Sequence, residues 1–426
     1  MNAVDSVATA VSARRALEAL RAGVPSREAV RVLGTEQPPV EQKFRQQLES
    51  ARADAAAGRQ TPGLLIGGDF GTGKSHLLAH LQQVALDEGF VCSRVVISKE
   101  TPLYDPAKLY RSAIHTASVP GRTGSAVKEL GTHLDTDSAG LASLSHWASR
   151  PDVGLSAHFA ATLFLYQKMH DPEVRDRITA FWSGDPLGIG QLRKWLRELG
   201  VGATYHVESV PAAELAVQRF VFLPRLAIAA GYAGWVLLVD ELELIGRYSF
   251  KQRARSYGEL ARWAGKSKAG GVPGLAAAFA ITTDFAAAVL HERNDLEAIP
   301  SKLRASERDA DRLLAARAEQ GMRFIAREVV RLKAPDRTRL ERIHQDVRVL
   351  YRQVYGWDPP EVEVGERLAT TRIRQYVRRW INEWDLRRLY ADYGAGDTVI
   401  DFLAPDYSEH PALGAADESP ESGADI

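Results

Sequence analysis

The sequence contains almost no cysteine and no long apolar run. Cys92 is the single cysteine among 426 residues, which excludes an intramolecular disulfide framework and a cysteine-based zinc site, and favours the reducing cytoplasm. No stretch approaches the ~18 to 20 apolar residues that a membrane-spanning helix needs, and residues 1–13 lack the basic and apolar regions of a secretion signal. We therefore expect a cytoplasmic protein with no membrane partner.

The chain also lacks net charge, because 54 Lys and Arg balance 54 Asp and Glu. Zero net charge gives no electrostatic argument for nucleic-acid binding, but the basic residues are unevenly distributed. Residues 301–342 hold twelve basic and seven acidic residues, and residues 251–268 hold six and one. Two interpretations stay open for these stretches: contact with the phosphates of double-stranded DNA, or ordinary solvated helix faces. No base-reading module is recognisable.

Residues 64–75 read Leu-Leu-Ile-Gly-Gly-Asp-Phe-Gly-Thr-Gly-Lys-Ser, an apolar strand followed by the spacing of a nucleotide-phosphate loop. In such a loop glycines let backbone N–H groups point at phosphates, Lys74 reaches the β and γ oxygens, and Ser75 ligates magnesium. The following helix, 76–86, directs its positive end at the anion. The residues expected to contact ATP or GTP are Gly68, Asp69, Phe70, Gly71, Thr72, Gly73, Lys74, Ser75 and His76. A glycine-rich turn without a ligand is the alternative, and it explains the flanking strand and helix less well.

A second signal is the apolar run at residues 235–239, which ends in Asp240 and Glu241. A fully apolar run is typical of a central parallel strand, and terminal carboxylates make it a Walker B element. Asp240 is expected to hold Mg²⁺ through its water shell, and Glu241 to orient and deprotonate the water that attacks the γ-phosphate. Acidic residues commonly begin loops, so the argument depends on the phosphate loop upstream. Together the two motifs predict ATP hydrolysis, with Lys74 and Glu241 as catalytic residues.

A further strand at residues 276–281 ends in Thr282 and Thr283. A polar residue at this place is expected to sense the γ-phosphate, and Thr283 or Thr282 can fill the role; an ordinary strand cap is the alternative. Other strands are expected at 63–66, 90–97 and 329–332. The pattern predicts an α/β fold, a P-loop NTPase (AAA+-like) parallel sheet.

The remaining chain is expected to be mostly helical. The expected parts are a helical N-terminal segment at 1–60, an ATPase core at 61–335 with a helical insertion at about 109–222, a helical lid at 336–393, and an acidic, largely disordered tail at 394–426. Aromatic residues of the insertion are expected to form its core rather than a stacking surface. They are Phe164, Phe181, Trp182 and Trp195.

The order of these elements resembles the AAA+ and related oligomeric ATPases. The resemblance implies a homo-oligomer whose Walker B strand lies beside the phosphate-loop strand, and an active site completed by arginines of the lid and of a neighbouring subunit. Candidate lid arginines are Arg372 and Arg374, and candidates to act on a neighbour are Arg293, Arg304 and Arg308. An arginine stabilises charge that develops on the γ-phosphate. For any single arginine, a solvated surface position is the alternative.

Longer strings resemble the ATP-binding P-loop proteins of BREX and Pgl type bacteriophage-defence systems. The strings are residues 21–25, 71–78, 97–106, 231–249 and 376–390, and the resemblance runs from Arg14 to about Tyr393. It implies ATP as the nucleotide and other defence-system proteins as partners, among them a methyltransferase and a helicase.

Two functional hypotheses follow. In the first, a hydrolytic ATPase couples turnover to DNA or to a partner of the defence system. In the second, ATP binding orders an oligomer or an interface, and hydrolysis only resets this switch. A small-molecule kinase is a weaker third reading, because no acceptor pocket is evident.

Overall fold

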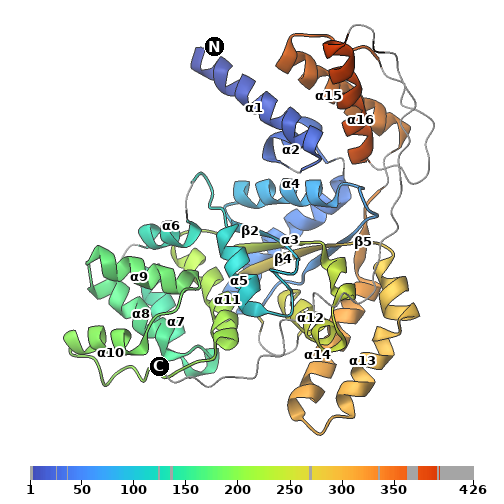
Figure 1. Cartoon of the computed structure of the whole chain (residues 1–426). Helices are drawn as coiled ribbons and strands as arrows, with labels where there is room; N and C mark the ends of the chain where they lie inside the picture. The colour runs from blue at the N-terminus through green and yellow to red at the C-terminus, as the bar shows by residue number, and fades with distance from the viewer. Residues whose placement is uncertain are drawn as a thin grey trace.

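The computed structural model has an α/β architecture, shown in Figure 1. It describes residues 3–24, 26–35, 37–122, 125–134, 138–267, 271–333, 336–361, 373–390 and 393. The Arg372 candidate and the acidic tail at 394–426 lie outside the described residues.

A five-stranded parallel sheet forms the centre of the molecule. Its strands are β1 (Leu64–Gly67), β2 (Val91–Val96), β3 (Trp235–Asp240), β4 (Leu275–Ile281) and β5 (Val329–Arg331). They lie in the order β2-β3-β4-β1-β5, and neighbouring strands are parallel. All five strands were predicted to within one or two residues.

The order of the strands corrects one expectation. The phosphate-loop strand β1 and the Walker B strand β3 were expected to be neighbours, but β4 pairs with both and separates them. β4 reads Leu-Ala-Ala-Ala-Phe-Ala-Ile and is buried along its whole length, and its four alanines allow helices to pack closely on both of its faces. The strand that ends in Thr282 and Thr283 therefore lies between the two nucleotide motifs.

Alternate residues of the central strands face two different cores. In β3, Trp235, Leu237 and Val239 belong to one core, and Val236 and Leu238 belong to the other. This alternation follows from the two-residue period of a strand. Both faces are apolar because helices cover both of them.

One face of the sheet is covered by α3 (Pro38–Ala56) and by α4 (Lys74–Asp87), the helix that follows the phosphate loop. The opposite core is larger and contains α5 (Pro106–His115), α11 (Ala212–Ala229), α12 (Phe250–Trp263) and α14 (Asp309–Arg327). The π-helical turn η3 (Ala286–Glu292) and helix α13 (Asp295–Arg304) connect β4 to α14. The buried ion pair of Arg253 with Asp295, at 2.8 Å, ties α12 to α13.

The expected insertion is a helical module between β2 and β3. It continues from α5 through α6 (Ala126–His133), α7 (Ala139–Ala148), the short turn η1 (Pro151–Val153), α8 (Ala157–Lys168), α9 (Pro172–Ser183) and α10 (Ile189–Glu198) to α11. Figure 1 shows these helices extending to one side of the sheet beyond β2. Phe181, Trp182 and Trp195 are buried and Phe164 packs against them, so the prediction that the aromatics form a core is confirmed.

The first described helices pack against the last described ones. Helices α1 (Ala3–Ala22) and α2 (Arg27–Leu33) share an apolar core with α15 (Arg337–Tyr355) and α16 (Ile373–Leu389), and Leu17 and Trp380 both belong to it. Arg21 of α1 pairs with Asp385 of α16 at 2.9 Å. We call these four helices the lid unit, which lies at the upper end of Figure 1, next to α4.

Two linkers join the lid unit to the sheet domain, and one side chain connects them. The amide of Gln37 donates to the carbonyl of Lys333 at 3.0 Å and accepts from its N–H at 3.2 Å. Arg339 of α15 donates to the carbonyl of Thr35 at 2.7 Å. The lid unit is thereby held above the phosphate loop.

Candidate functional site

The phosphate loop lies between β1 and α4, and its glycines have backbone geometry that other residues seldom adopt. Gly71 and Gly73 have φ values of 78° and 97°, which lie in the region that disfavours a Cβ atom. At Gly68 a Cβ would lie 2.5 Å from the Thr72 hydroxyl. The loop is therefore built from backbone, as expected for a cradle whose N–H groups bind phosphate oxygens.

Lys74 is folded back onto this loop. Its ammonium donates to the carbonyl of Gly68 at 2.8 Å and to that of Asp69 at 3.3 Å, and it lies 5.5 Å from the centre of the Phe70 ring. Burial lowers the pKa of Lys74, and nearby carboxylates, Glu243 first among them, oppose this effect. The lysine thus stands beside the place where a β or γ phosphate oxygen would bind.

The Walker B carboxylates lie at the end of β3, where Asp240 is the last residue of the strand and Glu241 follows it. Asp240 is buried and accepts from the backbone N–H of Glu241 at 3.0 Å. Glu241 has a left-handed backbone, with φ 58° and ψ 39°, which is uncommon for a residue with a side chain. Both carboxylates line the cavity above the phosphate loop. Partial desolvation and the neighbouring Asp240 raise the pKa of Glu241, whereas Lys74 and Arg374 lower it.

Glu243 is a site residue that the motif analysis missed. It lies in the 3₁₀ turn η2 (Leu242–Arg247), only 5% of it is exposed, and one of its oxygens approaches the Lys74 ammonium to 4.0 Å. Its other oxygen, Oε2, is buried without a hydrogen-bond partner. Burial raises the pKa of Glu243 to about 7, against the opposing effect of Lys74. An acidic residue between two leucines, just after a buried strand, is the sequence signal that was available.

The residues after β4 contact the phosphate loop, as their position between β1 and β3 requires. The hydroxyl of Thr283 donates to the carboxylate of Asp69 in a short hydrogen bond, whereas Thr282 is buried. Thr283, one of the two sensor candidates, therefore contacts the phosphate loop directly. It connects the end of β4 to the loop that would hold the phosphates.

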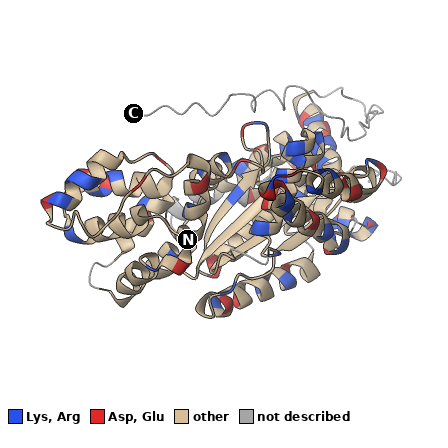
Figure 2. Ribbon diagram, turned by 90° about the horizontal axis from the view of Figure 1, so that it is seen from below, with Lys and Arg blue, Asp and Glu red and all other residues tan. Residues whose placement is uncertain are grey.

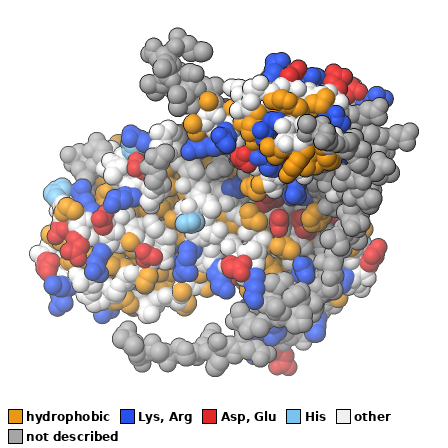
Figure 3. All heavy atoms as spheres, turned by 45° about the horizontal axis from the view of Figure 1, so that its top comes forward, with side chains coloured by type: hydrophobic (Ala, Val, Ile, Leu, Met, Phe, Trp, Pro, Cys, Tyr) orange, Lys and Arg blue, Asp and Glu red, His pale blue; other side chains and the backbone are white. Residues whose placement is uncertain are grey.

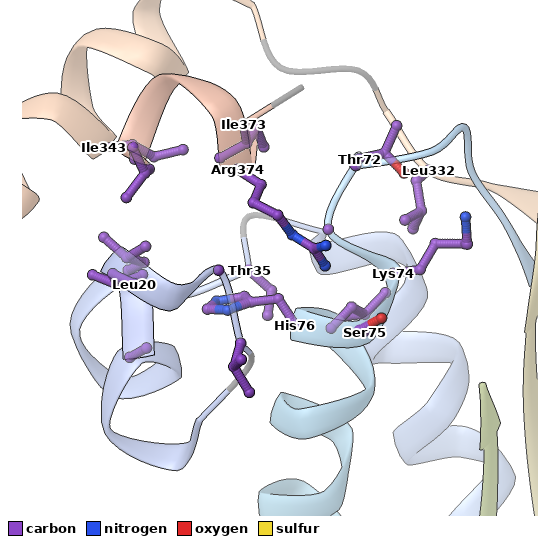
Figure 4. A pocket seen from close by; sticks show the side chains of 18 of the residues that line it. Leu20, Thr35, Thr72, Lys74, Ser75, His76, Leu332, Ile343, Ile373 and Arg374 are labelled. Atoms are coloured by element: carbon purple, nitrogen blue, oxygen red, sulfur yellow. The ribbon is translucent and has the colours of Figure 1, made fainter. Parts of the chain in front are cut away.

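A cavity of about 360 Å³ opens above the phosphate loop, between that loop and the lid unit. Figure 4 shows Leu20, Ile343 and Ile373 on its lid side, and Lys74 and Ser75 on its sheet side. The volume lies within the range of about 300–1,000 Å³ that is typical of small-molecule sites. Apolar walls from the lid unit and a polar floor from the loop match a base at one end and phosphates at the other.

Arg374 and His76 both belong to this cavity. Arg374, the second residue of α16, extends from the lid into the space above Ser75 (Figure 4). His76, directly after Ser75, lies 2.8 Å from the carbonyl of Gly34 through its Nε2. Burial lowers the pKa of His76. The first contributes a positive charge to the cavity, and the second contacts the linker that carries α2.

The three arginines proposed to act on a neighbouring subunit lie elsewhere. Arg293 donates to the carbonyl of Gly246 within its own chain, Arg304 pairs with Glu319 at 2.6 Å, and Arg308 is exposed. None of these three lines the cavity described above.

The site has the groups that ATP and Mg²⁺ require. Backbone N–H groups of the loop and the start of α4 suit the phosphates, and Lys74 and Arg374 supply positive charge. A hydroxyl at Ser75 and a carboxylate at Asp240 are hard oxygen ligands, and Mg²⁺ typically takes one or two of these together with phosphate oxygens and water. A bound ion would supply charge neutralisation between the phosphates, and these two residues would hold it.

The two basic stretches do not form a surface of one sign. In the stretch at 251–268, Arg253 forms the buried ion pair with Asp295, and Lys266 pairs with Glu328 at 2.6 Å. Figure 2 shows Lys and Arg alternating with Asp and Glu along the outer helices. On the face seen in Figure 3 the charges are intermingled too, and apolar side chains gather near the lid helices at the upper right.

Sheet, loop and carboxylates together define a P-loop NTPase-like protein. Residues 9–131 and 212–389 match the family of the BREX system ATP-binding protein BrxC/D, and because they make up most of the chain, the chain belongs to that family. This confirms the resemblance to BREX ATP-binding proteins and supports ATP as the ligand. The match omits residues 132–211, which contain helices α7 to α10.

Further comparisons add little to this identification. No curated protein and no solved structure matches the chain. Among the described residues, no helix is long and apolar enough to cross a membrane.

Proposed function

We propose that this BREX-family protein hydrolyses ATP with Mg²⁺ and couples the reaction to DNA or to a partner in anti-phage defence. The observation that carries the proposal is that Glu241 lines the same cavity as the phosphate loop and Arg374. A nucleotide-storage site needs the loop alone. A carboxylate opposite the loop adds a group that can orient and deprotonate an attacking water.

Each group has a role in this proposal. Ser75 and Asp240 hold Mg²⁺, Lys74 contacts the β and γ phosphate oxygens, and Glu241 acts as the base. Thr283 senses the γ-phosphate through its position beside Asp69. Arg374 stabilises developing charge from the lid side. The loop residues Gly68 to His76 form the ATP-binding segment.

We further place the protein in the AAA+-like class, as a cytoplasmic homo-oligomer. Arg293, Arg304 or Arg308 would then complete a neighbour's site, which is supported by their lying outside the chain's own cavity. Arg372, with Arg374, is a second lid candidate.

Its partners would be other proteins of the defence system, such as a helicase or methyltransferase, and double-stranded DNA. The ion pairs within the basic stretches favour a protein partner over direct DNA contact.

A switch with little intrinsic turnover is the second candidate. It is favoured by the construction of the cavity, whose walls come from the phosphate loop, α1, the linker at Thr35 and α16. ATP in this cavity would contact both ends of the chain at once and stabilise one position of the lid unit. Binding alone could then create or remove a partner surface.

The test is steady-state ATP hydrolysis at several protein concentrations, with and without double-stranded DNA, at low and physiological salt. A Glu241→Gln variant should bind ATP and lose turnover, and Glu307→Gln, which removes an exposed carboxylate, serves as the charge-matched control. DNA stimulation supports the coupled ATPase, and a rate per subunit that rises with concentration supports a site completed by a neighbour. Slow turnover that depends neither on DNA nor on protein concentration supports the switch. Unchanged turnover in Glu241→Gln excludes Glu241 as the base.

A further inference from the structure

The carboxylate of Glu243 approaches the ammonium of Lys74, and its position follows from the backbone conformation after β3. The left-handed conformation at Glu241 turns the chain into η2. As a result Glu241 is exposed, whereas Glu243, which lines the same cavity, is only 5% exposed. Two glutamates separated by one residue therefore have different environments.

The carboxylate of Glu243 lacks part of the hydrogen bonding that a buried carboxylate normally has. Its Oε1 is 4.0 Å from the Lys74 ammonium, which is an ion-pair distance but too long for a hydrogen bond. Its Oε2 is buried with no partner. Buried carboxylates are normally fully hydrogen-bonded, and an exception calls for an explanation in terms of function or an additional ligand. The cation that it approaches, Lys74, is the residue proposed to bind phosphate.

Lys74 has three anchors, the carbonyls of Gly68 and Asp69 and the carboxylate of Glu243. Phosphate oxygens would compete with these anchors for the same ammonium. The carboxylate is the strongest competitor, because it carries a full charge in a place with little solvent screening.

We propose that Glu243 is a positioning residue that holds Lys74 while the site is empty of nucleotide and competes with the β and γ phosphates for it. Nucleotide binding breaks the contact between Lys74 and Glu243, and nucleotide release restores it. The carboxylate thus weakens binding and favours the departure of product. The proposal rests on nucleotide binding, which the proposed function also requires, but not on hydrolysis.

The proposal is tested by the affinities of ATP, ADP and AMP for Glu243→Gln, measured by calorimetry at pH 8 in EDTA. Removing the competing charge should strengthen ATP and ADP binding about tenfold. AMP, which lacks the phosphates that Lys74 reaches, should change by less than about twofold. A merely structural role for Glu243 would change AMP binding as well.

Two further variants make the test specific. Glu241→Gln removes the same charge from the same segment, and because Glu241 forms no ion pair with Lys74, this variant should strengthen ADP binding clearly less. In a Lys74→Ala background, Glu243→Gln should give no gain for ADP over AMP, because a double-mutant cycle isolates the pairwise interaction. The proposal is overturned by weaker ATP binding in Glu243→Gln, by an equal gain for AMP, or by an equal gain in Glu241→Gln. Absence of hydrolysis by the wild-type protein would refute the ATPase proposal and leave this one standing if the affinities behave as stated.

Discussion

The pH dependence of folding stability should report directly on Glu243. Burial raises the pKa of this carboxyl from 4.5 to about 7, so between these values the folded protein keeps a proton that the unfolded chain releases. Raising the pH through this window therefore favours unfolding. Since one pKa unit corresponds to about 1.4 kcal/mol, the loss of unfolding free energy amounts to about 3 kcal/mol between pH 4.5 and pH 8.

Glu243→Gln removes this contribution, because an amide does not titrate. Denaturant unfolding of the nucleotide-free protein, measured from pH 4.5 to pH 8, should show a flatter profile in the variant than in the wild type. The two curves should diverge by about 3 kcal/mol across the window. Glu307→Gln, which changes an exposed glutamate, should follow the wild type. Parallel curves for Glu243→Gln and the wild type would refute the argument that burial governs this carboxyl.

Three other substitutions have defined outcomes. Gly68→Ala should weaken ATP binding at least about tenfold in calorimetry, because its Cβ meets the loop's own side chains; Gly190→Ala, with open space around it, should not. Arg253→Ala should lower the unfolding free energy by about 3–5 kcal/mol, because it leaves the buried carboxylate of Asp295 unpaired. The same variant should leave DNA affinity in a filter-binding assay unchanged. Loss of DNA binding in the folded variant would contradict a structural role for Arg253. Gln37→Ala should lower the free energy of unfolding by about 1–3 kcal/mol. It should also speed hydrogen–deuterium exchange at the backbone of Lys333, which Gln37 hydrogen-bonds. Unchanged exchange would show that Gln37 does not hold the two linkers together.

The nucleotide motifs could be predicted because their signals are local. The phosphate loop needs glycines at fixed spacing after an apolar strand, and β3 is recognised by an uninterrupted apolar run that ends in Asp240. The cap of α15 is equally local, because the carboxylate of Asp336 accepts from the N–H of Arg339 at 2.8 Å. Each of these depends on residues that are close in the sequence.

What could not be predicted depends on residues that are far apart. Nothing in the sequence of β4 states that it lies between β1 and β3, because a buried strand is apolar whichever strands it pairs with. Glu243 was overlooked for a related reason. Its importance comes from Lys74, which lies in a different motif and reaches it only through the sheet order.

The lid unit has a consequence for how the chain matures on the ribosome. Leu17 and Ala29 belong to the first helices made, but the apolar core in which they are buried also contains Trp380 and Trp384, which are among the last described residues. During synthesis the apolar faces of α1 and α2 must therefore wait for almost the whole chain to emerge, and contacts between such distant segments form slowly. A truncated product that ends before α16 would leave these faces only partly covered and prone to aggregation. The cavity for ATP therefore becomes complete only when α16 has packed against α1.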